Sequence, residues 1–206
     1  LGFVSRKMPK SCTRIGILDN VIPHEPHFFD APLTLWFLKS IDGAITLCDE
    51  VGKDLTKLNS DIPHMTLPHP TYTHFGCPID KAQAEKLLCI PHKDDSRTLL
   101  FFGLIREYKG LDILIRAMKL LDQRYRLIIA GEPYGSFDKY SDLISECGAP
   151  SRFFIFPQYI KDSEVKKYFC AADLAVLPYR SATQSGINAV ANHFELPMVV
   201  TDVGGL

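Results

Sequence analysis

The sequence has no closely spaced cysteines, no long apolar run and no excess of charge of either sign. Its six cysteines are scattered over 206 residues without a Cys-x-x-Cys pair or a histidine at zinc spacing, which excludes the common structural zinc sites. No apolar run reaches the ~20 residues that a membrane-spanning helix needs. The formal net charge of -1 argues against the basic character that is typical of nucleic-acid-binding domains.

Several motifs of well-known enzyme classes are also missing. No Gly-x-Gly-x-x-Gly follows an apolar strand, which argues against a nicotinamide oxidoreductase. No phosphate-binding P-loop and no Ser-His-Asp arrangement is visible. The chain does not begin with Met, and residues 1–7 have the wrong charge order for a secretory signal, so we expect a cytoplasmic protein with reduced thiols.

Apolar segments of strand length alternate with amphipathic helical segments. In the clearest helix, 111–121, Asp112 and Arg116 are spaced to pair on the exposed side. Wholly apolar strands that alternate with helices are typical of α/β proteins with parallel sheets covered on both faces. The expected strands are 14–18, 44–47, 62–67, 98–102, 126–130, 152–156, 174–177 and 198–201, and the expected helices are 33–40, 49–58, 79–88, 111–121, 140–146, one capped by Asp162, and 186–194.

The prolines and the glycine between residues 68 and 78 indicate a linker. We expect residues 1–70 to be the C-terminal part of one parallel-sheet domain, 71–96 a linker with a connecting helix, and 97–206 a nearly complete second domain. The chain opens on no obvious element and ends just past an apolar strand, so we expect a fragment of a longer enzyme. In such sheets ligands bind outside the carboxyl ends of the strands.

The loop after strand 98–102 is suited to a phosphate or diphosphate. Gly103 allows a ligand to approach the backbone closely, and Arg106 and Lys109 supply positive charge. The helix that follows begins with unpaired N–H groups and a partial positive charge. An ordinary turn with two solvated cations is the alternative, and the loop alone does not decide between them.

Two more loops lie at strand ends of the same kind. Glu132 follows strand 126–130 and either lines the same cleft or sits in a plain turn with its side chain in solvent. The segment 180–186 opens a helix that Ser185 can cap, and its hydroxyl and amide groups can bind phosphate oxygens without a metal. Alone, the segment favours a plain capped helix start, and phosphate binding is the better interpretation only beside the cationic loop. The candidate binding groups are therefore Gly103, Glu132, Thr183, Gln184, Ser185 and Gly186, around the cations Arg106 and Lys109.

Together, these segments resemble the nucleotide-binding domain of family-4 (group 1) glycosyltransferases of the GT-B fold. The resemblance covers nearly all of 97–206 and rests on 102–110, 129–132, 171–179 and 197–206, in that order. Residues 19–25 and 48–55 match more loosely, and through them the first half resembles the end of the acceptor domain of such enzymes. The resemblance implies two Rossmann-like domains, of which the first is incomplete here.

The resemblance implies a retaining hexosyltransferase of polysaccharide biosynthesis. Such an enzyme moves a hexose from a UDP-, GDP- or similar sugar to a glycan or lipid-linked acceptor, with no metal or other cofactor. It implies a cytoplasmic location, with peripheral contact at the inner membrane face left open, and no nucleic-acid partner. The oligomeric state, the donor base and sugar, and the acceptor are not readable. As a fragment, the chain is not expected to catalyse transfer alone.

Lys109 matches the diphosphate-binding lysine of the family. The family's arginine usually follows the glycine directly, but Leu104 stands there, and its role is assigned to Arg106 two residues on. On the acceptor side, the histidine often found at a strand end is replaced by Asp19, with His24 nearby. Arg106 and Lys109 are therefore the expected catalytic cations, and Asp19 or His24 the acceptor-side group.

The common Glu-x7-Glu motif of the family is absent. Thr183 occupies the first position and Val190 or Ala191 the second, which leaves open the groups that bind the donor ribose. The Ala-Thr-Gln-Ser-Gly segment resembles a variant subgroup. The missing glutamates keep a second hypothesis open, a non-catalytic nucleotide-sugar-binding partner subunit. A third is another GT-B enzyme, such as a sugar phosphorylase or an epimerase.

Overall fold

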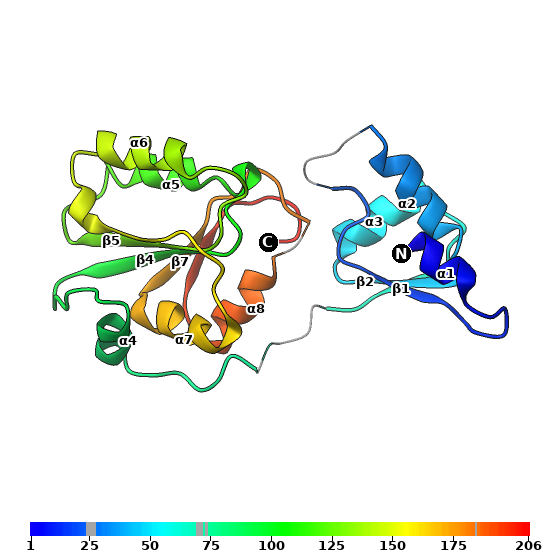
Figure 1. Ribbon diagram of the computed structural model, residues 1–206, viewed down its shortest axis with the longest axis horizontal. Helices are drawn as coiled ribbons and strands as arrows, with labels where there is room; N and C mark the ends of the chain where they lie inside the picture. Colours follow the sequence, from blue (N-terminus) through cyan, green and yellow to red (C-terminus); the bar gives the residue numbers. More distant parts are fainter. Residues whose placement is uncertain (24–27, 69–71, 73, 184) are drawn as a thin grey trace. The chain divides into compact units, whose positions relative to one another are not determined.

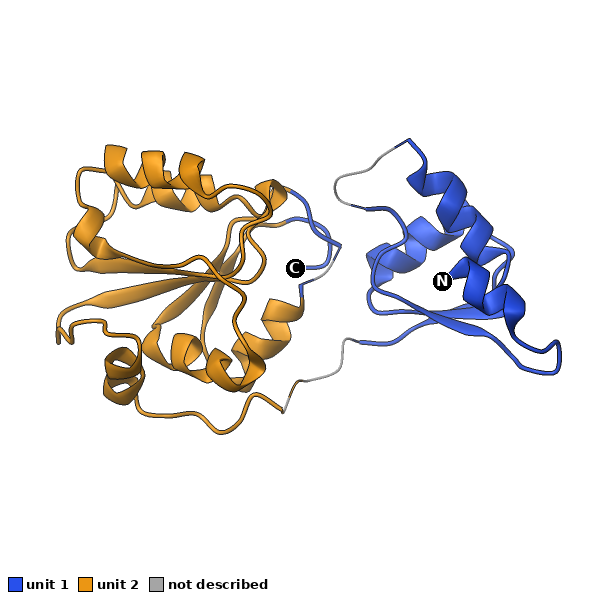
Figure 2. Cartoon of the chain, viewed as in Figure 1, with its two compact units in different colours: residues 1–70, 181–185, 203–206 blue, residues 71–180, 186–202 orange. Residues whose placement is uncertain are grey.

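The computed structural model describes residues 1–23, 28–68, 72, 74–183 and 185–206, so the expectations for His24 and Gln184 fall outside the described residues. The chain divides into two compact units (Figures 1 and 2). Unit 1 comprises residues 1–70, 181–185 and 203–206, and unit 2 comprises residues 71–180 and 186–202.

Unit 2 is built on a five-stranded parallel sheet with the order β6-β5-β4-β7-β8. The chain starts in the centre with β4, adds β5 and β6 on one side, and then returns to add β7 and β8 on the other. The order therefore reverses between β4 and β7, which is where open α/β sheets bind ligands. The strands are β4 (Arg97–Phe102), β5 (Tyr125–Ala130), β6 (Phe153–Phe156), β7 (Leu174–Leu177) and β8 (Met198–Val200).

Helices cover both faces of this sheet (Figure 1). One face carries α5 (Leu111–Ala117) and α6 (Asp138–Glu146), and the other carries α4 (Lys81–Leu87), α7 (Asp162–Ala171) and α8 (Gly186–His193). Two short 3-10 helices, η1 (Glu107–Lys109) and η2 (Pro150–Arg152), complete the unit. The expected α/β fold with parallel sheets is confirmed.

Alternate residues of the central strands face the two helical layers, because side chains of a strand point to opposite faces in turn. Leu99 and Phe101 of β4 belong to a buried cluster with the apolar stripe of α5. Phe102, one residue on, packs on the other face, with its ring centroid 4.9 Å from that of Phe169 in α7. Full burial of an apolar side chain of this size stabilises the fold by about 1.5–3 kcal/mol.

Unit 1 holds a smaller parallel sheet with the order β1-β2-β3. Its strands are β1 (Ile15–Leu18), β2 (Gly43–Thr46) and β3 (His64–Thr66), and its helices are α1 (Gly2–Lys7), α2 (Asp30–Leu38) and α3 (Asp49–Leu58). Val51 and Leu55 of α3 are fully buried, as their spacing predicts.

The expected elements are present, but some of their bounds differ. The helix expected at 111–121 ends at Ala117, because beyond its C-cap Met118 the N–H groups of Lys119 and Leu120 bond three residues back instead of four. The helix expected at 33–40 already begins at Asp30, and α1 was not expected.

Two expected side-chain roles are wrong. Asp162 is the first residue of α7 and not its cap, which is Lys161 and makes no side-chain capping bond. Asp112 does not form its ion pair with Arg116, because its Oδ2 accepts from Nη2 of Arg180 at 2.7 Å. That partner lies after β7 in the chain.

Candidate functional site

The candidate site of unit 2 lies where β4 ends. Gly103 follows the strand with φ +102°, and its N–H donates to the carbonyl of Ala130 at 2.9 Å. A Cβ at Gly103 would lie 3.2 Å from Nζ of Lys109 and 3.4 Å from Cδ1 of Ile187. The glycine therefore leaves room for the Lys109 ammonium and the first turn of α8 above the end of the strand.

The loops after β4 and β5 run side by side. A Cβ at Gly131, whose φ is +146°, would lie 2.0 Å from the carbonyl oxygen of Gly103, so only glycine fits this approach. Beyond it, the N–H of Ile105 donates to the carbonyl of Glu132 at 2.8 Å, and the N–H of Tyr134 donates back to Ile105 at 3.0 Å. These bonds bring the main chain of Glu132 to the β4 loop, while its side chain is exposed.

Lys109 ends the short helix η1 and is half-buried. Gly110 follows with φ +66°, and a Cβ there would lie 2.0 Å from the carbonyl oxygen of Pro178, so the turn packs directly on the segment after β7. Nζ of Lys109 lies 5.5 Å from the ring centroid of Tyr179. Within the described residues, no carboxylate pairs with Lys109.

The electrostatics of Lys109 follow from this placement. Burial of the ammonium, and then the positive charge of Arg106, lower the pKa of Lys109 to about 8. Arg106 caps η1, and its Cζ lies 4.2 Å from the ring centroid of Tyr134. Two adjacent cations, one of them without a carboxylate, form a site suited to an anion with more than one charge.

The residues expected around these cations fall into two groups. Gly186 begins α8 in unit 2, and the α8 residue next to it, Ile187, comes close to Gly103. Thr183 and Ser185 belong to unit 1, where Oγ1 of Thr183 donates to Oδ1 of Asn20. The binding roles of all these residues stay predictions.

The position of the second missing glutamate is buried in α8. Val190 is 4% exposed and Ala191 is 0% exposed, so neither is accessible to a ligand on α8. Sequence reasoning also missed Tyr134 and Tyr179, whose rings lie beside the two cations. For Tyr179, the position directly after Pro178 at the end of β7 was an available signal.

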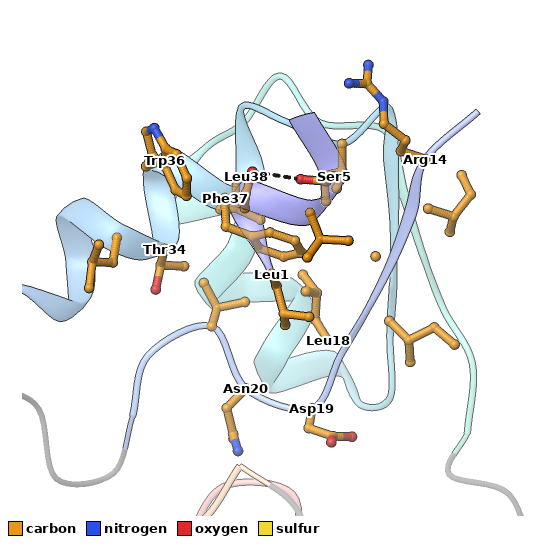
Figure 3. A pocket seen from close by; sticks show the side chains of 18 of the residues that line it. Leu1, Ser5, Arg14, Leu18, Asp19, Asn20, Thr34, Trp36, Phe37 and Leu38 are labelled. Atoms are coloured by element: carbon orange, nitrogen blue, oxygen red, sulfur yellow. Dashed lines mark hydrogen bonds between the residues drawn. The ribbon is translucent and has the colours of Figure 1, made fainter. Parts of the chain in front are cut away.

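In unit 1, Asp19 follows β1 and lines a pocket of about 960 Å³ (Figure 3). The lining is largely apolar and includes Leu18, Trp36 and Phe37.

Within the described part of the chain, no group of three or more His, Cys, Asp or Glu residues is arranged to hold a metal ion. No helix of the described residues is long and apolar enough to cross a membrane.

Comparisons with known sequences identify relatives of the chain. A D-inositol 3-phosphate glycosyltransferase of Catenulispora acidiphila is 33% identical over 140 residues, which are 63% of this chain and 33% of that protein. A GDP-mannose:glycolipid 4-beta-D-mannosyltransferase of Xanthomonas campestris pv. campestris is 31% identical over 103 residues, 49% of this chain and 29% of that protein. The chain thus spans about a third of the length of these relatives.

Solved structures resemble the fold over most of the chain. Sucrose-phosphate synthase from Thermosynechococcus elongatus matches 87% of this chain and 45% of that chain, with a TM-score of 0.75 at 20% identity. Anabaena HepE in complex with UDP-glucose matches 93% of this chain and 54% of that chain, with a TM-score of 0.77 at 14% identity. These likenesses confirm the GT-B fold.

Residues 96–206, more than half of the chain, match the family model described as glycosyl transferases group 1. The chain therefore belongs to the group 1 glycosyltransferases.

Proposed function

We propose that the protein is a retaining hexosyltransferase that moves a hexose from a nucleoside diphosphate sugar to a glycan or lipid-linked acceptor, without a metal cofactor. The observation that carries the proposal is Lys109: a half-buried cation beside Arg106, with no carboxylate partner among the described residues, at the point where the strand order reverses. Membership of the family supports the reaction class.

The two cations act on the leaving group. As the bond from the sugar to the diphosphate breaks, negative charge develops on the diphosphate oxygens, and Lys109 and Arg106 stabilise it from fixed positions. The partial positive charge at the start of α8 acts in the same direction, because Ile187 brings this helix end close to Gly103. Removing one preorganised donor from an oxyanion-stabilising site typically costs about 3–4 kcal/mol in the barrier.

The names of the relatives support the substrate classes. One solved neighbour holds UDP-glucose, and one relative is named for GDP-mannose and a glycolipid acceptor. We accordingly propose a nucleoside diphosphate sugar as donor and a glycan or lipid-linked acceptor. With a lipid-linked acceptor, a cytoplasmic protein would work in peripheral contact with the membrane.

A second candidate function is donor binding without turnover. It is favoured by α8, where Val190 or Ala191 occupies the position of the family's second glutamate; both candidates are apolar and buried. A binding subunit would keep the affinity of the Lys109 site and lack transfer. Release of nucleoside diphosphate from the bound donor, with or without acceptor, separates the candidates: turnover supports the enzyme, and tight binding with no release supports the subunit.

The donor site is tested by thermal shift with a panel of UDP-, GDP- and ADP-sugars. We expect at least one of them to raise the melting temperature of the wild-type chain, and Lys109→Ala to lose that shift. Lys119→Ala, which removes an exposed lysine just past α5, is the matched control and is expected to keep it. An equal shift in Lys109→Ala and wild type would contradict the proposal.

A further inference from the structure

We propose that Arg180 is a positioning residue that fixes the turn carrying Lys109 in the geometry needed to bind a diphosphate. This inference rests on the proposed function of the Lys109 site. Arg180 lies three residues after β7 and would not touch the donor in this role. It would act through η1.

Arg180 bonds to both sides of the Lys109 turn. Its main-chain N–H donates to the carbonyl of Tyr108 at 2.7 Å. Its Nη1 donates to the carbonyl of Glu107, also at 2.7 Å, and its Nη2 donates to Oδ2 of Asp112 at 2.7 Å. Three bonds from one residue thus reach the residues before and after Lys109.

The neighbouring residues of the same segment pack on the same turn. The carbonyl of Pro178 lies against Gly110, and the rings of Tyr179 and Tyr108 meet edge to face with centroids 5.9 Å apart. Residues 178–180 and 107–112 therefore form one contact, with Lys109 held against the ring of Tyr179. Without the guanidinium, the turn loses two of the three bonds that Arg180 makes to it.

The ion pair between Arg180 and Asp112 is partly exposed. Its effect on the position of the Lys109 turn can therefore be measured separately from its effect on folding stability. The side chains of Arg180 and Asp112 are 42% and 24% exposed. Such pairs contribute little to folding, so the loss of Arg180 should leave unit 2 folded. A small displacement of a binding group, in contrast, has a large effect on the geometry that a charged ligand requires.

The test uses the 206-residue chain with Arg180→Ala, and Arg124→Ala as the matched control. Arg124 forms an exposed ion pair with Asp122. Calorimetry with UDP, GDP and ADP is expected to show at least tenfold weaker binding for Arg180→Ala and an unchanged constant for Arg124→Ala. Asp112→Ala should weaken binding less, and the double variant no more than Arg180→Ala alone. Equal affinity of Arg180→Ala and wild type would overturn the proposal.

A second readout does not depend on any donor. The reactivity of Lys109 with an amine-specific reagent, followed against pH by mass spectrometry, is expected to have its midpoint near 8 in the wild type. In Arg180→Ala the Lys109 midpoint should rise above this value, because a released turn exposes the ammonium to solvent and burial is the larger cause of the lowered pKa. If Arg180 only stabilised the fold, its replacement by alanine would lower the melting temperature and leave the Lys109 midpoint unchanged. That result would overturn the proposal.

The two readouts keep the two proposals apart. If no nucleoside diphosphate binds the wild type but the Lys109 midpoint rises in Arg180→Ala, Arg180 still fixes the Lys109 turn and the proposed function fails. If Arg180→Ala does not fold, Arg180→Lys decides by the same readouts. Lysine can bond to Glu107 or to Asp112 but not to both at once, so intermediate values are expected, and wild-type values would overturn the role.

Discussion

Among single residues, Lys109 combines burial with closeness to a second cation, and both lower its pKa, to about 8. Arg106 and Lys109 could be proposed as site residues from the sequence because they follow a strand and a glycine. Arg180 was not, since its partners Glu107 and Asp112 lie about seventy residues earlier in the chain and no local pattern marks them. The expected Asp112–Arg116 pair was wrong for the same reason: helical spacing does not reveal a competing partner from a distant loop.

The lowered pKa of Lys109 predicts a pH dependence of donor binding. Below pH 8 the unliganded ammonium is mostly protonated, whereas above pH 8 it is increasingly neutral. A bound diphosphate favours the protonated form, so above pH 8 binding must also take up a proton. We expect donor affinity to be constant between pH 7 and 7.5 and to fall by up to about tenfold per pH unit above about pH 8.

Calorimetry of the most tightly bound sugar nucleotide at pH 7 to 9 checks this dependence. The Lys109→Ala variant is the control, because weak binding without the lysine should not change over the same range. A wild-type affinity that is flat up to pH 9 would show that Lys109 does not titrate against the donor.

At the scale of elements, a buried ion pair holds α4 against the sheet at the end opposite the candidate site. Glu85 of α4 accepts from Nη2 of Arg126 in β5 at 2.8 Å, and both side chains are at most 5% exposed. Arg126 also donates to Oγ1 of Thr98 at 2.9 Å and to the carbonyl of Pro91. The ion pair ties the connecting helix to the two central strands.

Glu85→Gln should therefore destabilise unit 2 strongly. Removing one charge leaves the buried guanidinium of Arg126 uncompensated, which lowers the free energy of unfolding by about 3–5 kcal/mol. Glu164→Gln, which breaks the partly exposed pair with Lys167 in α7, should cost about 0–1 kcal/mol. Urea unfolding is best followed by circular dichroism, because the single tryptophan, Trp36, lies in unit 1. Equal urea midpoints for Glu85→Gln and Glu164→Gln would refute a structural role of the Glu85–Arg126 pair.

Periodicity decided which elements could be predicted. Helix α3 and strand β7 have the expected bounds, because their apolar residues follow a clear pattern between polar ends. Helix α1 has six residues, of which only Gly2 and Ser5 are buried. It therefore has no apolar stripe from which the sequence could predict a helix. The three-residue η1 is too short for any period, although it carries Lys109.

At the scale of the whole molecule, each unit holds a parallel sheet, and the sheet of unit 2 reverses its strand order between β4 and β7. The alternation of apolar strands and helices was enough to predict the parallel sheets, but it does not give their strand order. The chemistry of the site was less accessible, because it depends on close approaches between loops. Gly103 against Gly131 and Gly110 against Pro178 are set by the folded chain and have no signal in the local sequence beyond the glycines.

The central claim is that the Lys109 site binds the diphosphate of a sugar nucleotide. Its most direct test is a crystal structure of the protein with a bound nucleoside diphosphate sugar. We expect diphosphate oxygens within hydrogen-bond distance of Nζ of Lys109 and of the Arg106 guanidinium, over Gly103. A diphosphate bound away from both cations would contradict it.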